Sequence, residues 1–470
     1  MHENKMGIMK MSKLLWVMGL PMILSMILQA IYNVVDTVFV VNREGLGQIA
    51  NQALTFAFPV QIFMIAIGVG TGVGINAMLS KSLGEGNKEV ANKVCGSGIA
   101  LGIIITLVFV LFGLFGANPY MQFMARNVDE RLYDKSTIVS LGSEYLSVCC
   151  VYSIGSVGFA IFERFLQATG KTMYSTIGQI SGALLNTLLD YVFIYPCNMG
   201  TFGAALATIL GQILSLSVAM FFHYFFNKEI DGHPKYIKPD FRIIRQIYTI
   251  GLPAMLMQIM LAVMMFLCIE IIGTQKEVGT LLQGAFGIYY KIMQIALFAC
   301  FGLSNTLISI VSYNHGMGDE KRVRKAILFG ILDSVIVAAV LTLLFQLLAT
   351  PISRLFGMTI SDGGKEVIRI CVSAMHIATI GYVFMGVSVA IQGILQGFRS
   401  VFLPLIISLL RLIVFVVPFS FLFLNIGDPL SAFWWTFPIS EFLTVICSLF
   451  FLLWKVKALK KRQVQKENQD

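Results

Sequence analysis

Twelve long apolar segments run through the sequence, and the short stretches between them carry most of the charged residues. Each segment holds about 20 to 30 residues, which is enough for one α-helix to cross a hydrocarbon core of ~30 Å. The runs lack the ten-residue polar and apolar alternation of membrane β-barrel strands. The pattern predicts an all-α integral membrane protein with transmembrane helices over residues 14–42, 50–80, 94–116, 137–162, 173–196, 203–226, 246–273, 280–311, 326–348, 367–395, 400–424 and 431–454.

The composition agrees with a membrane protein. Hydrophobic residues make up 57% of the 470 positions and charged residues 13%, with a mean hydropathy of +0.80. A soluble domain usually carries about 25% charged residues. The first segment is too long for a cleaved signal peptide and contains Asp36, so it is expected to stay as a helix. The eight cysteines are scattered, which predicts packed thiols rather than disulfides or a metal site.

The net charge of +9 follows from membrane topology. If the N-terminus lies in the cytoplasm and the spans alternate, 24 of the 34 Lys and Arg residues lie inside, Arg164 among them, and eight lie outside. The other two, Lys291 and Arg411, fall within spans. The positive-inside rule therefore predicts a multi-pass protein of a bacterial cytoplasmic membrane with both termini in the cytoplasm. The basic residues imply no nucleic-acid partner.

Short motifs recur at a nearly constant offset. Gly-Leu-Pro occupies 19–21 and again 251–253, and a glycine-rich turn occupies 83–87 and again 315–319, both with an offset of 232. Six helices followed by six similar helices predict two lobes related by a pseudo-twofold axis along the membrane normal, as in many transporters. The predicted parts are an N-lobe over 1–226, a cytoplasmic linker over 227–245, a C-lobe over 246–455 and a basic cytoplasmic tail over 456–470.

Three spans of the first half carry polar residues at helical spacing, and such faces should meet in the interior of the bundle. An ionised side chain at mid-membrane costs ~2.5–3.5 kcal/mol. Because Asp36 and Asp190 are both expected to be buried and near each other, one of them should hold a proton at neutral pH. The carboxylate, amide and hydroxyl oxygens of these stripes would equally suit Na⁺. Hydrogen-bonded helix packing remains an alternative for the amides. The stripes are Ser25, Gln29, Asn33 and Asp36; Gln179, Asn186 and Asp190; and Thr208, Gln212 and Ser215.

Two further features concern bending and charge. Pro21 lies fifteen residues before Asp36 in the same span, so a mobile bend and a static kink both remain open. The second half carries charges whose signs nearly cancel, which indicates ion pairing without identifying the pairs or their roles. They are Glu270, Lys291, Asp333, His376, Arg411 and Glu441.

Two glycine-containing segments resemble nucleotide-binding loops without matching them. Gly68, Gly70, Gly72 and Gly74 lie inside a predicted span, where close helix packing accounts for them. The segment 168–172 ends like a Walker A motif, but the leading glycine is missing, and no catalytic spacing is found. The sequence thus predicts neither an ATP-driven pump nor an enzyme, and no cofactor beyond a coupling ion.

Several of these segments together resemble the multidrug and toxic compound extrusion (MATE) family, on its DinF-like side and in particular its MepA-like branch. The similarity covers nearly the whole chain and the order of the motifs is specific. It is carried by the run from Gly19 through Asp36 to Val40, by Leu83–Gly86, by Asn186–Asp190 and by Gly203–Thr208.

The resemblance implies two six-helix lobes that alternate between inward and outward openings. It also implies a cation site of Asp36, Asn186, Asp190 and Thr208, a bend at Pro21, and a nearby Tyr145. In the NorM-like branch a glutamate follows the seventh-helix proline, whereas Leu261 occupies that position here, which argues against a C-lobe cation site of that type. The supporting polar residues are Gln29, Asn33, Gln179 and Gln212.

The leading hypothesis is a secondary antiporter that exports organic cations and amphiphilic drugs in exchange for H⁺ or Na⁺, working as a monomer. A lipid-linked precursor flippase is the alternative. It would favour a cavity lined with several Arg and Lys residues, and the first half offers no basic residue in the middle of a span. A channel or a membrane-embedded enzyme is more distant. The substrate, the coupling ion and the oligomeric state stay open.

Overall fold

The computed structural model describes residues 4–41, 47–127, 135–230, 236–275, 278–357 and 364–467. Within these ranges the side chains of residues 32–41, 47–52, 127, 280, 355–357, 364 and 461–467 are outside the description. Asp36 of the predicted cation site and the supporting residue Asn33 are therefore placed by their backbone alone.

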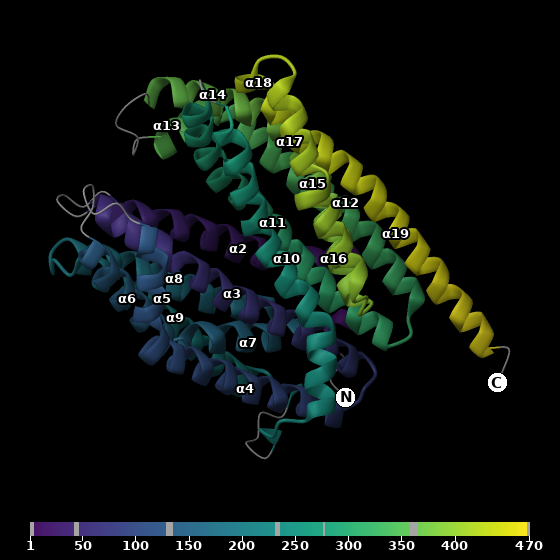
Figure 1. Ribbon diagram of the computed structural model, residues 1–470. Coiled ribbons are helices and arrows are strands. Elements are labelled where there is room, and N and C mark those ends of the chain that lie inside the picture. The colour runs from purple at the N-terminus through teal and green to yellow at the C-terminus, as the bar shows by residue number, and fades with distance from the viewer. Residues whose placement is uncertain are drawn as a thin grey trace. The chain divides into compact units, whose positions relative to one another are not determined.

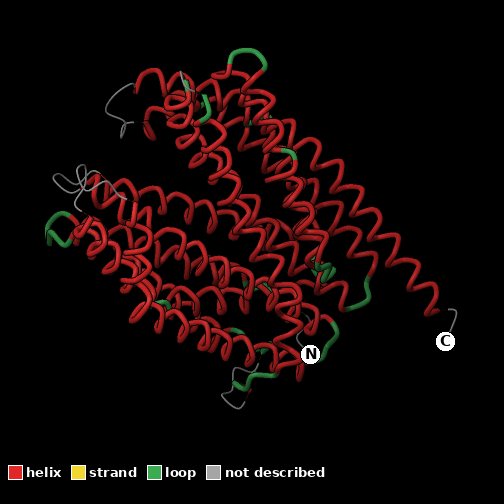
Figure 2. The backbone as a smooth tube through the Cα atoms, viewed as in Figure 1, coloured by secondary structure: helices red, strands yellow, loops and turns green. Residues whose placement is uncertain are grey.

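The regular elements among the described residues are all helical (Figures 1 and 2). The first half contains α1 (Lys5–Ile8), α2 (Met11–Val41), α3 (Gly47–Gly84), α4 (Lys88–Leu111), η1 (Phe112–Gly116), α5 (Ala117–Met124), η2 (Ala125–Asn127), α6 (Lys135–Val151), α7 (Ile154–Ala168), α8 (Thr172–Ile194) and α9 (Gly200–Phe226). The second half contains α10 (Phe241–Gly273), α11 (Gly279–Gly316), α12 (Glu320–Leu347), α13 (Ala349–Gly357), α14 (Gly364–Ala378), α15 (Gly381–Gly397), α16 (Phe402–Leu409), η4 (Leu410–Val414), α17 (Val416–Asn425), α18 (Pro429–Ala432), η5 (Phe433–Trp435) and α19 (Thr436–Glu467).

The predicted transmembrane segments are confirmed. Among the described residues, ten helices are long and apolar enough to cross a membrane, and two bent pairs bring the number to twelve if each is one span. These pairs are α6 with α7, bent by 41°, and α14 with α15, bent by 57°. They correspond to the fourth and tenth predicted spans, so the bend recurs at the same place in each half.

Helix ends also repeat between the halves. Gly86 and Gly318 both have positive φ, at 72° and 74°, as do Gly170 at 81° and Arg399 at 55°. Each donates its backbone N–H to the carbonyl three residues earlier. This left-handed residue after a helix satisfies carbonyls that the helix leaves unpaired. The matched endings support the internal repeat seen in the sequence.

By its contacts the chain divides into two compact units. Unit 1 is Met1–Ile259 with Ser312–Glu320, and unit 2 is Met260–Val311 with Lys321–Asp470. The boundaries lie inside α10 and α11, and each unit has its own buried apolar side chains. The lobe limits at 226 and 246 remain a prediction.

The glycines of α3 serve close helix packing, as the sequence indicates. Gly68 and Gly72 face α7, whereas Gly70 and Gly74 face α10. A Cβ atom on Gly70 would lie 2.6 Å from the carbonyl oxygen of Gly251. Backbones approach this closely only where side chains are absent. The two glycine pairs, each with its members one turn apart, therefore let α3 pack closely against α7 on one side and α10 on the other.

Gly74→Ala is expected to destabilise the protein by about 1–3 kcal/mol through overpacking. Its Cβ would lie 2.2 Å from the carbonyl oxygen of Ile247, so the two backbones would have to separate. Gly68→Ala is the matched control, because its Cβ would be 3.6 Å from the nearest atom, an ordinary contact. Thermal unfolding in detergent should show a lowered Tm for the first variant only. Equal Tm values would contradict this account of the glycines.

Candidate functional site

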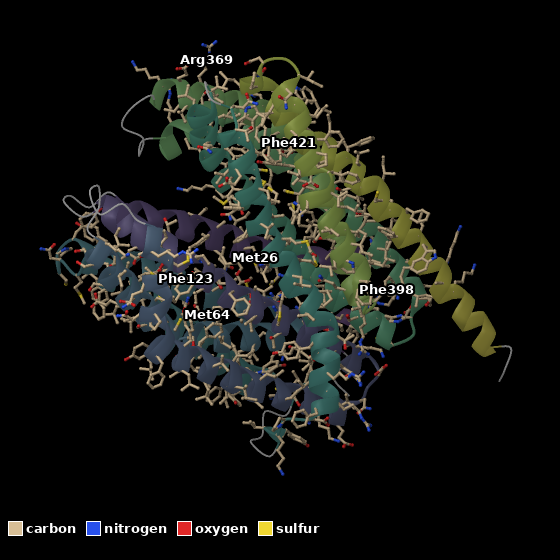
Figure 3. The ribbon with its side chains drawn as sticks, viewed as in Figure 1. Met26, Met64, Phe123, Arg369, Phe398 and Phe421 are labelled. Carbon is tan, nitrogen blue, oxygen red and sulfur yellow. The ribbon has the colours of Figure 1, made fainter. Side chains whose placement is uncertain are left out.

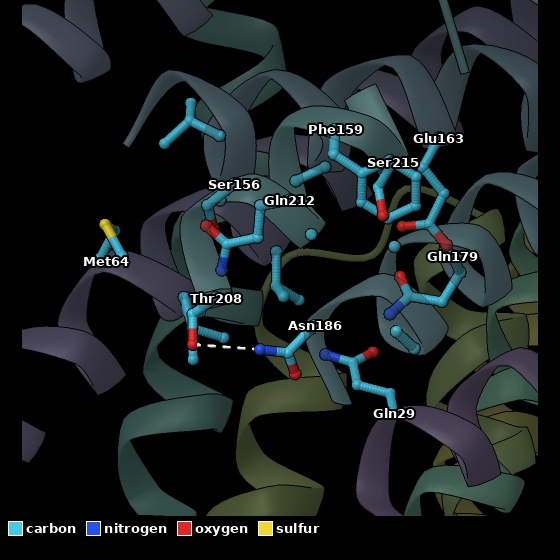
Figure 4. A pocket seen from close by; sticks show the side chains of 18 of the residues that line it. Gln29, Met64, Ser156, Phe159, Glu163, Gln179, Asn186, Thr208, Gln212 and Ser215 are labelled. Atoms are coloured by element: carbon cyan, nitrogen blue, oxygen red, sulfur yellow. Dashed lines mark hydrogen bonds between the residues drawn. The ribbon is translucent and has the colours of Figure 1, made fainter. Parts of the chain in front are cut away.

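A cavity of about 110 Å³ lies within unit 1. Its wall is formed by α2, α3, α7, α8 and α9, which are five membrane-spanning helices (Figure 4). Met26 of α2 and Met64 of α3, labelled in Figure 3, contribute adaptable apolar surface. The polar residues of the lining are Gln29, Ser156, Glu163, Arg164, Gln179, Asn186, Thr208, Gln212 and Ser215.

A glycine crossing brings α8 and α9 together beside the cavity. A Cβ atom on Gly182 would lie 2.4 Å from the carbonyl oxygen of Gly211, and one on Gly211 would lie 2.7 Å from that of Gly182. Both residues line the cavity. This close approach places the polar stripes of the two helices opposite each other, as the predicted meeting of polar faces requires.

Asn186 and Thr208 meet across this crossing. The Asn186 Nδ2 donates to the Thr208 Oγ1 at 3.4 Å, and Thr208 donates to the carbonyl of Ala204 at 2.9 Å. The Asn186 side chain is almost fully buried. These contacts leave the side-chain amide oxygen of Asn186, Oδ1, without a hydrogen-bond partner among the described residues. An oxygen of this kind at a cavity wall is suited to bind a cation or a water molecule.

Asp190 lies one helical turn beyond Asn186 on α8. Its side chain is fully buried, with a relative exposure of 0%, and it is outside the set of residues that line the cavity. Since residues four positions apart share a helix face, its carboxylate lies on the same side of α8 as Asn186. The carboxylate thus sits deep in a membrane-spanning bundle, next to the Asn186–Thr208 contact.

The residues of α2 are only partly described. Gln29 lines the cavity, and Pro21 lies buried two turns earlier within a helix that continues through it. Asn33 and Asp36 follow Gln29 on α2, but their side chains lie outside the described residues. The predicted contribution of Asp36 to the cation site therefore stays a prediction.

The remaining predicted polar residues divide into two groups. Gln179 and Gln212 line the cavity, on α8 and α9 respectively. Tyr145 is buried on α6 outside the lining, where its hydroxyl accepts a hydrogen bond of 2.8 Å from Gln61 Nε2. Gln61 was not identified from the sequence, because it stands in an apolar stretch of α3 without polar residues at helical spacing.

Glu163 and Arg164 of α7 also line the cavity, and neither was identified from the sequence as a site residue. The sequence placed Arg164 at the cytoplasmic turn after the fourth span. The structure places it within α7, which continues to Ala168, and its exposure is only 3%. Arg164 lies four residues before α7 ends, so it does not contradict the expectation that the first half has no basic residue in the middle of a span. The predicted span ended at 162, so it left out the last six residues of α7, which include both charges. Ser156 and Glu163, seven positions apart on one face, were the available signal.

In unit 2 the structure identifies one of the expected ion pairs. Arg411 Nε donates to Glu441 Oε1 at 2.7 Å, with side-chain exposures of 4% and 14%. Arg411 belongs to η4, a π-helical turn between α16 and α17. Leu261 lies in α10, where a C-lobe cation site of the NorM type would need a glutamate.

Comparison with known proteins decides the family. The family model described as MatE matches residues 21–192 and 253–422, one segment in each half of the chain. The chain belongs to the MATE family. Its members are transporters, so the chain is a membrane transporter rather than an enzyme, as the sequence predicts.

Relatives and solved structures agree with this assignment. The multidrug export protein MepA of Staphylococcus aureus strain MRSA252 is 26% identical over 400 residues, covering 81% of this chain and 83% of MepA. MepA of Staphylococcus saprophyticus is 23% identical over 395 residues, with the same coverage. A solved structure described as an outward-facing multidrug resistance MATE transporter of the MOP superfamily matches with a TM-score of 0.89 and 21% identity, covering 98% of this chain and 99% of that one. A MATE structure in a straight conformation matches with a TM-score of 0.87, 22% identity and coverage of 97% and 98%. These structures support the MATE fold.

Proposed function

We propose that this MATE transporter exports organic cations and amphiphilic drugs in exchange for H⁺ or Na⁺ that moves inward. The observation that carries the proposal is the polar cavity of unit 1, which lies inside a membrane-spanning bundle. Its polar lining includes Gln29, Gln179, Asn186, Thr208 and Gln212. Deep polar residues of this kind mark ion and substrate pathways in membrane proteins. The proteins named MepA, which are multidrug exporters, support the substrate class.

The size of the cavity favours the cation as its occupant. Its volume of about 110 Å³ is well below the ~300–1,000 Å³ of sites that enclose drug-sized molecules. It has room for a few water molecules or a partly hydrated cation. The carboxylate and amide oxygens around it are ligands that a hard cation prefers. The drug would therefore bind elsewhere in this conformation.

In the proposed cycle, the coupling cation enters from outside and binds Asp36 and Asp190. Neutralising these carboxylates changes the hydrogen bonds around α2, and α2 bends near Pro21. The bend weakens the drug site, so the drug leaves outward before the transporter returns to its inward-open state. When net charge moves inward, the membrane potential contributes ~2.3 kcal/mol per charge per 100 mV.

The proposed membrane topology follows from the distribution of Lys and Arg residues along the chain. We place the protein in a bacterial cytoplasmic membrane with both termini in the cytoplasm, acting as a monomer, and the bacterial MepA relatives support this membrane. A flippase for lipid-linked precursors is not favoured by the relatives. The buried Arg164 is a basic residue of the kind that a flippase would use, so the substrate has to be tested directly.

The test is ethidium efflux from vesicles in which a pH gradient and a Na⁺ gradient are imposed separately. Wild-type efflux is expected to follow one of the two gradients, which identifies the coupling ion, and Asp36→Asn is expected to lose that dependence because an amide neither releases a proton nor balances a cation. Efflux that ignores both gradients would overturn the antiport. Transport of a lipid-linked pyrophosphate but not of ethidium would favour the flippase.

A further inference from the structure

The polar lining of the cavity continues well beyond the predicted cation site. On α8 it runs from Asn186 to Gln179, and on α9 from Thr208 through Gln212 to Ser215. Seven residues of α-helix correspond to roughly 10 Å along the axis. The cavity is therefore elongated along the helices, with the Asn186–Thr208 contact at one end (Figure 4).

Glu163 occupies the other end. Figure 4 shows its carboxyl group beside Ser215 and Gln179, away from Asn186 and Thr208. Glu163 lies five residues before α7 ends at Ala168, and Asn186 lies fourteen residues after α8 begins at Thr172. Because a three-residue turn joins these helices in antiparallel order, a rise of 1.5 Å per residue separates the two side chains by roughly 13 Å along the bundle.

The surroundings of Glu163 compensate the charge of its carboxylate only in part. Its exposure is 6%, and among the described residues none of the Lys, Arg or His nitrogens lies within 4.0 Å of its carboxylate. The neighbouring Arg164 donates from its Nη1 to Gln167 Oε1 at 2.8 Å, and the Arg164 charge and the Gln167 side chain both act on the Glu163 carboxylate.

The facing elements supply only neutral groups to Glu163. These are Ser215 of α9 and Gln179 of α8 inside the cavity, while on α3 the glycine at 72 packs against the stem of Arg164. A buried carboxylate that stays ionised without a counter-ion in contact is costly, and the charge of Arg164 offsets only part of that cost. A bound proton, or a cation held with the Ser215 and Gln179 oxygens, removes that cost.

We propose that Glu163 is a second acceptor for the coupling cation, at the end of the cavity near the turn between α7 and α8. The inference rests on the proposed antiport and adds its release step. The cation passes from the site near Asn186 along the polar lining to Glu163, and from there to the solution on the side of the α7–α8 turn. For a proton, the donor carboxyl becomes ionised as Glu163 becomes neutral, and Glu163 regains its charge on release.

The test compares two assays on the purified transporter in proteoliposomes. Gradient-driven ethidium transport needs the cation to be released, whereas ethidium counterflow without a cation gradient needs only the substrate cycle. Glu163→Gln is expected to slow gradient-driven transport by roughly tenfold or more while counterflow stays within about twofold of the wild type. Glu163→Asp should restore part of the gradient-driven rate, because it restores a carboxylate.

Controls distinguish a coupling role from a substrate contact and from a structural role. Glu89→Gln removes an exposed carboxylate paired with Lys93 and should leave both assays unchanged. If Glu163→Gln loses counterflow and has a raised KM for ethidium, Glu163 is a substrate contact. If the variant loses both activities, has a lowered Tm and is not rescued by Glu163→Asp, Glu163 is structural. Either result, or two normal rates, overturns the inference. A wild type that ignores both gradients would instead overturn the antiport itself. Separate pH and Na⁺ gradients show which cation Glu163 accepts.

Discussion

Replacing Asp190 with asparagine is expected to lower gradient-driven ethidium efflux by roughly tenfold or more while the protein stays folded. Asp190 is fully buried, one turn from the Asn186–Thr208 contact. Asparagine keeps the shape of the side chain and, like a protonated aspartic acid, offers both a donor and an acceptor, so it preserves helix packing. It removes only the ability to take up and release a proton or to neutralise a cation. The substitution therefore separates a coupling role from a packing role.

The measurement is the initial rate of ethidium efflux under the gradient that drives the wild type, at matched expression and Tm. Asp428→Asn is the matched control. Asp428 caps the N-terminus of α18 by accepting from the Leu430 N–H, and asparagine caps helices as well as aspartate does. A wild-type rate in Asp190→Asn, with its gradient dependence intact, would reduce Asp190 to a packing residue and remove it from the proposed site.

The largest expected effect on stability is that of Glu441→Ala. Its partner Arg411 is 4% exposed, so the variant leaves a guanidinium charge buried in unit 2 without its carboxylate. Removing one member of a buried ion pair typically costs about 3–5 kcal/mol. We expect a large fall in Tm and in the amount of folded protein recovered in detergent.

Two comparisons make this prediction specific. The double variant Arg411→Met with Glu441→Leu should recover much of the lost Tm, since apolar residues of similar volume often replace a buried pair without loss. Glu89→Ala breaks an exposed pair of similar length, 2.6 Å to Lys93, and should leave the Tm unchanged because solvent screens that pair. A small Tm change in Glu441→Ala, similar to that of Glu89→Ala, would show that solvent reaches Arg411.

Several features could be predicted from the sequence with good accuracy. The predicted span 173–196 corresponds to α8 at Thr172–Ile194, and 203–226 to α9 at Gly200–Phe226. Hydropathy finds such helices because each membrane helix pairs its own backbone groups, which makes its position a local property. The spacing of Asn186, Thr208 and Gln212 likewise predicted that their polar faces would meet, since the helical period determines which residues share a face.

Other features could not be predicted because they depend on contacts between distant segments. Glu163 was not identified, since the predicted span ended at 162 and a charged residue near a helix end looks the same in sequence whether it faces solvent or a cavity. Gln61 shows its partner, Tyr145, only when α3 and α6 are packed together.

The sequence by itself thus determined the membrane-spanning class, the repeat, the family and the polar stripes, because these depend on local composition, period and order. The tertiary structure decided which side chains meet. The glycines at 182 and 211 set how closely α8 and α9 approach, and the rotation of α7 turns Glu163 into the cavity. It also showed that Arg411 and Glu441 form an ion pair, which the sequence could not select among the titratable residues of the second half. Helix crossing and rotation arise from packing over the whole bundle, and no local pattern in the chain specifies them.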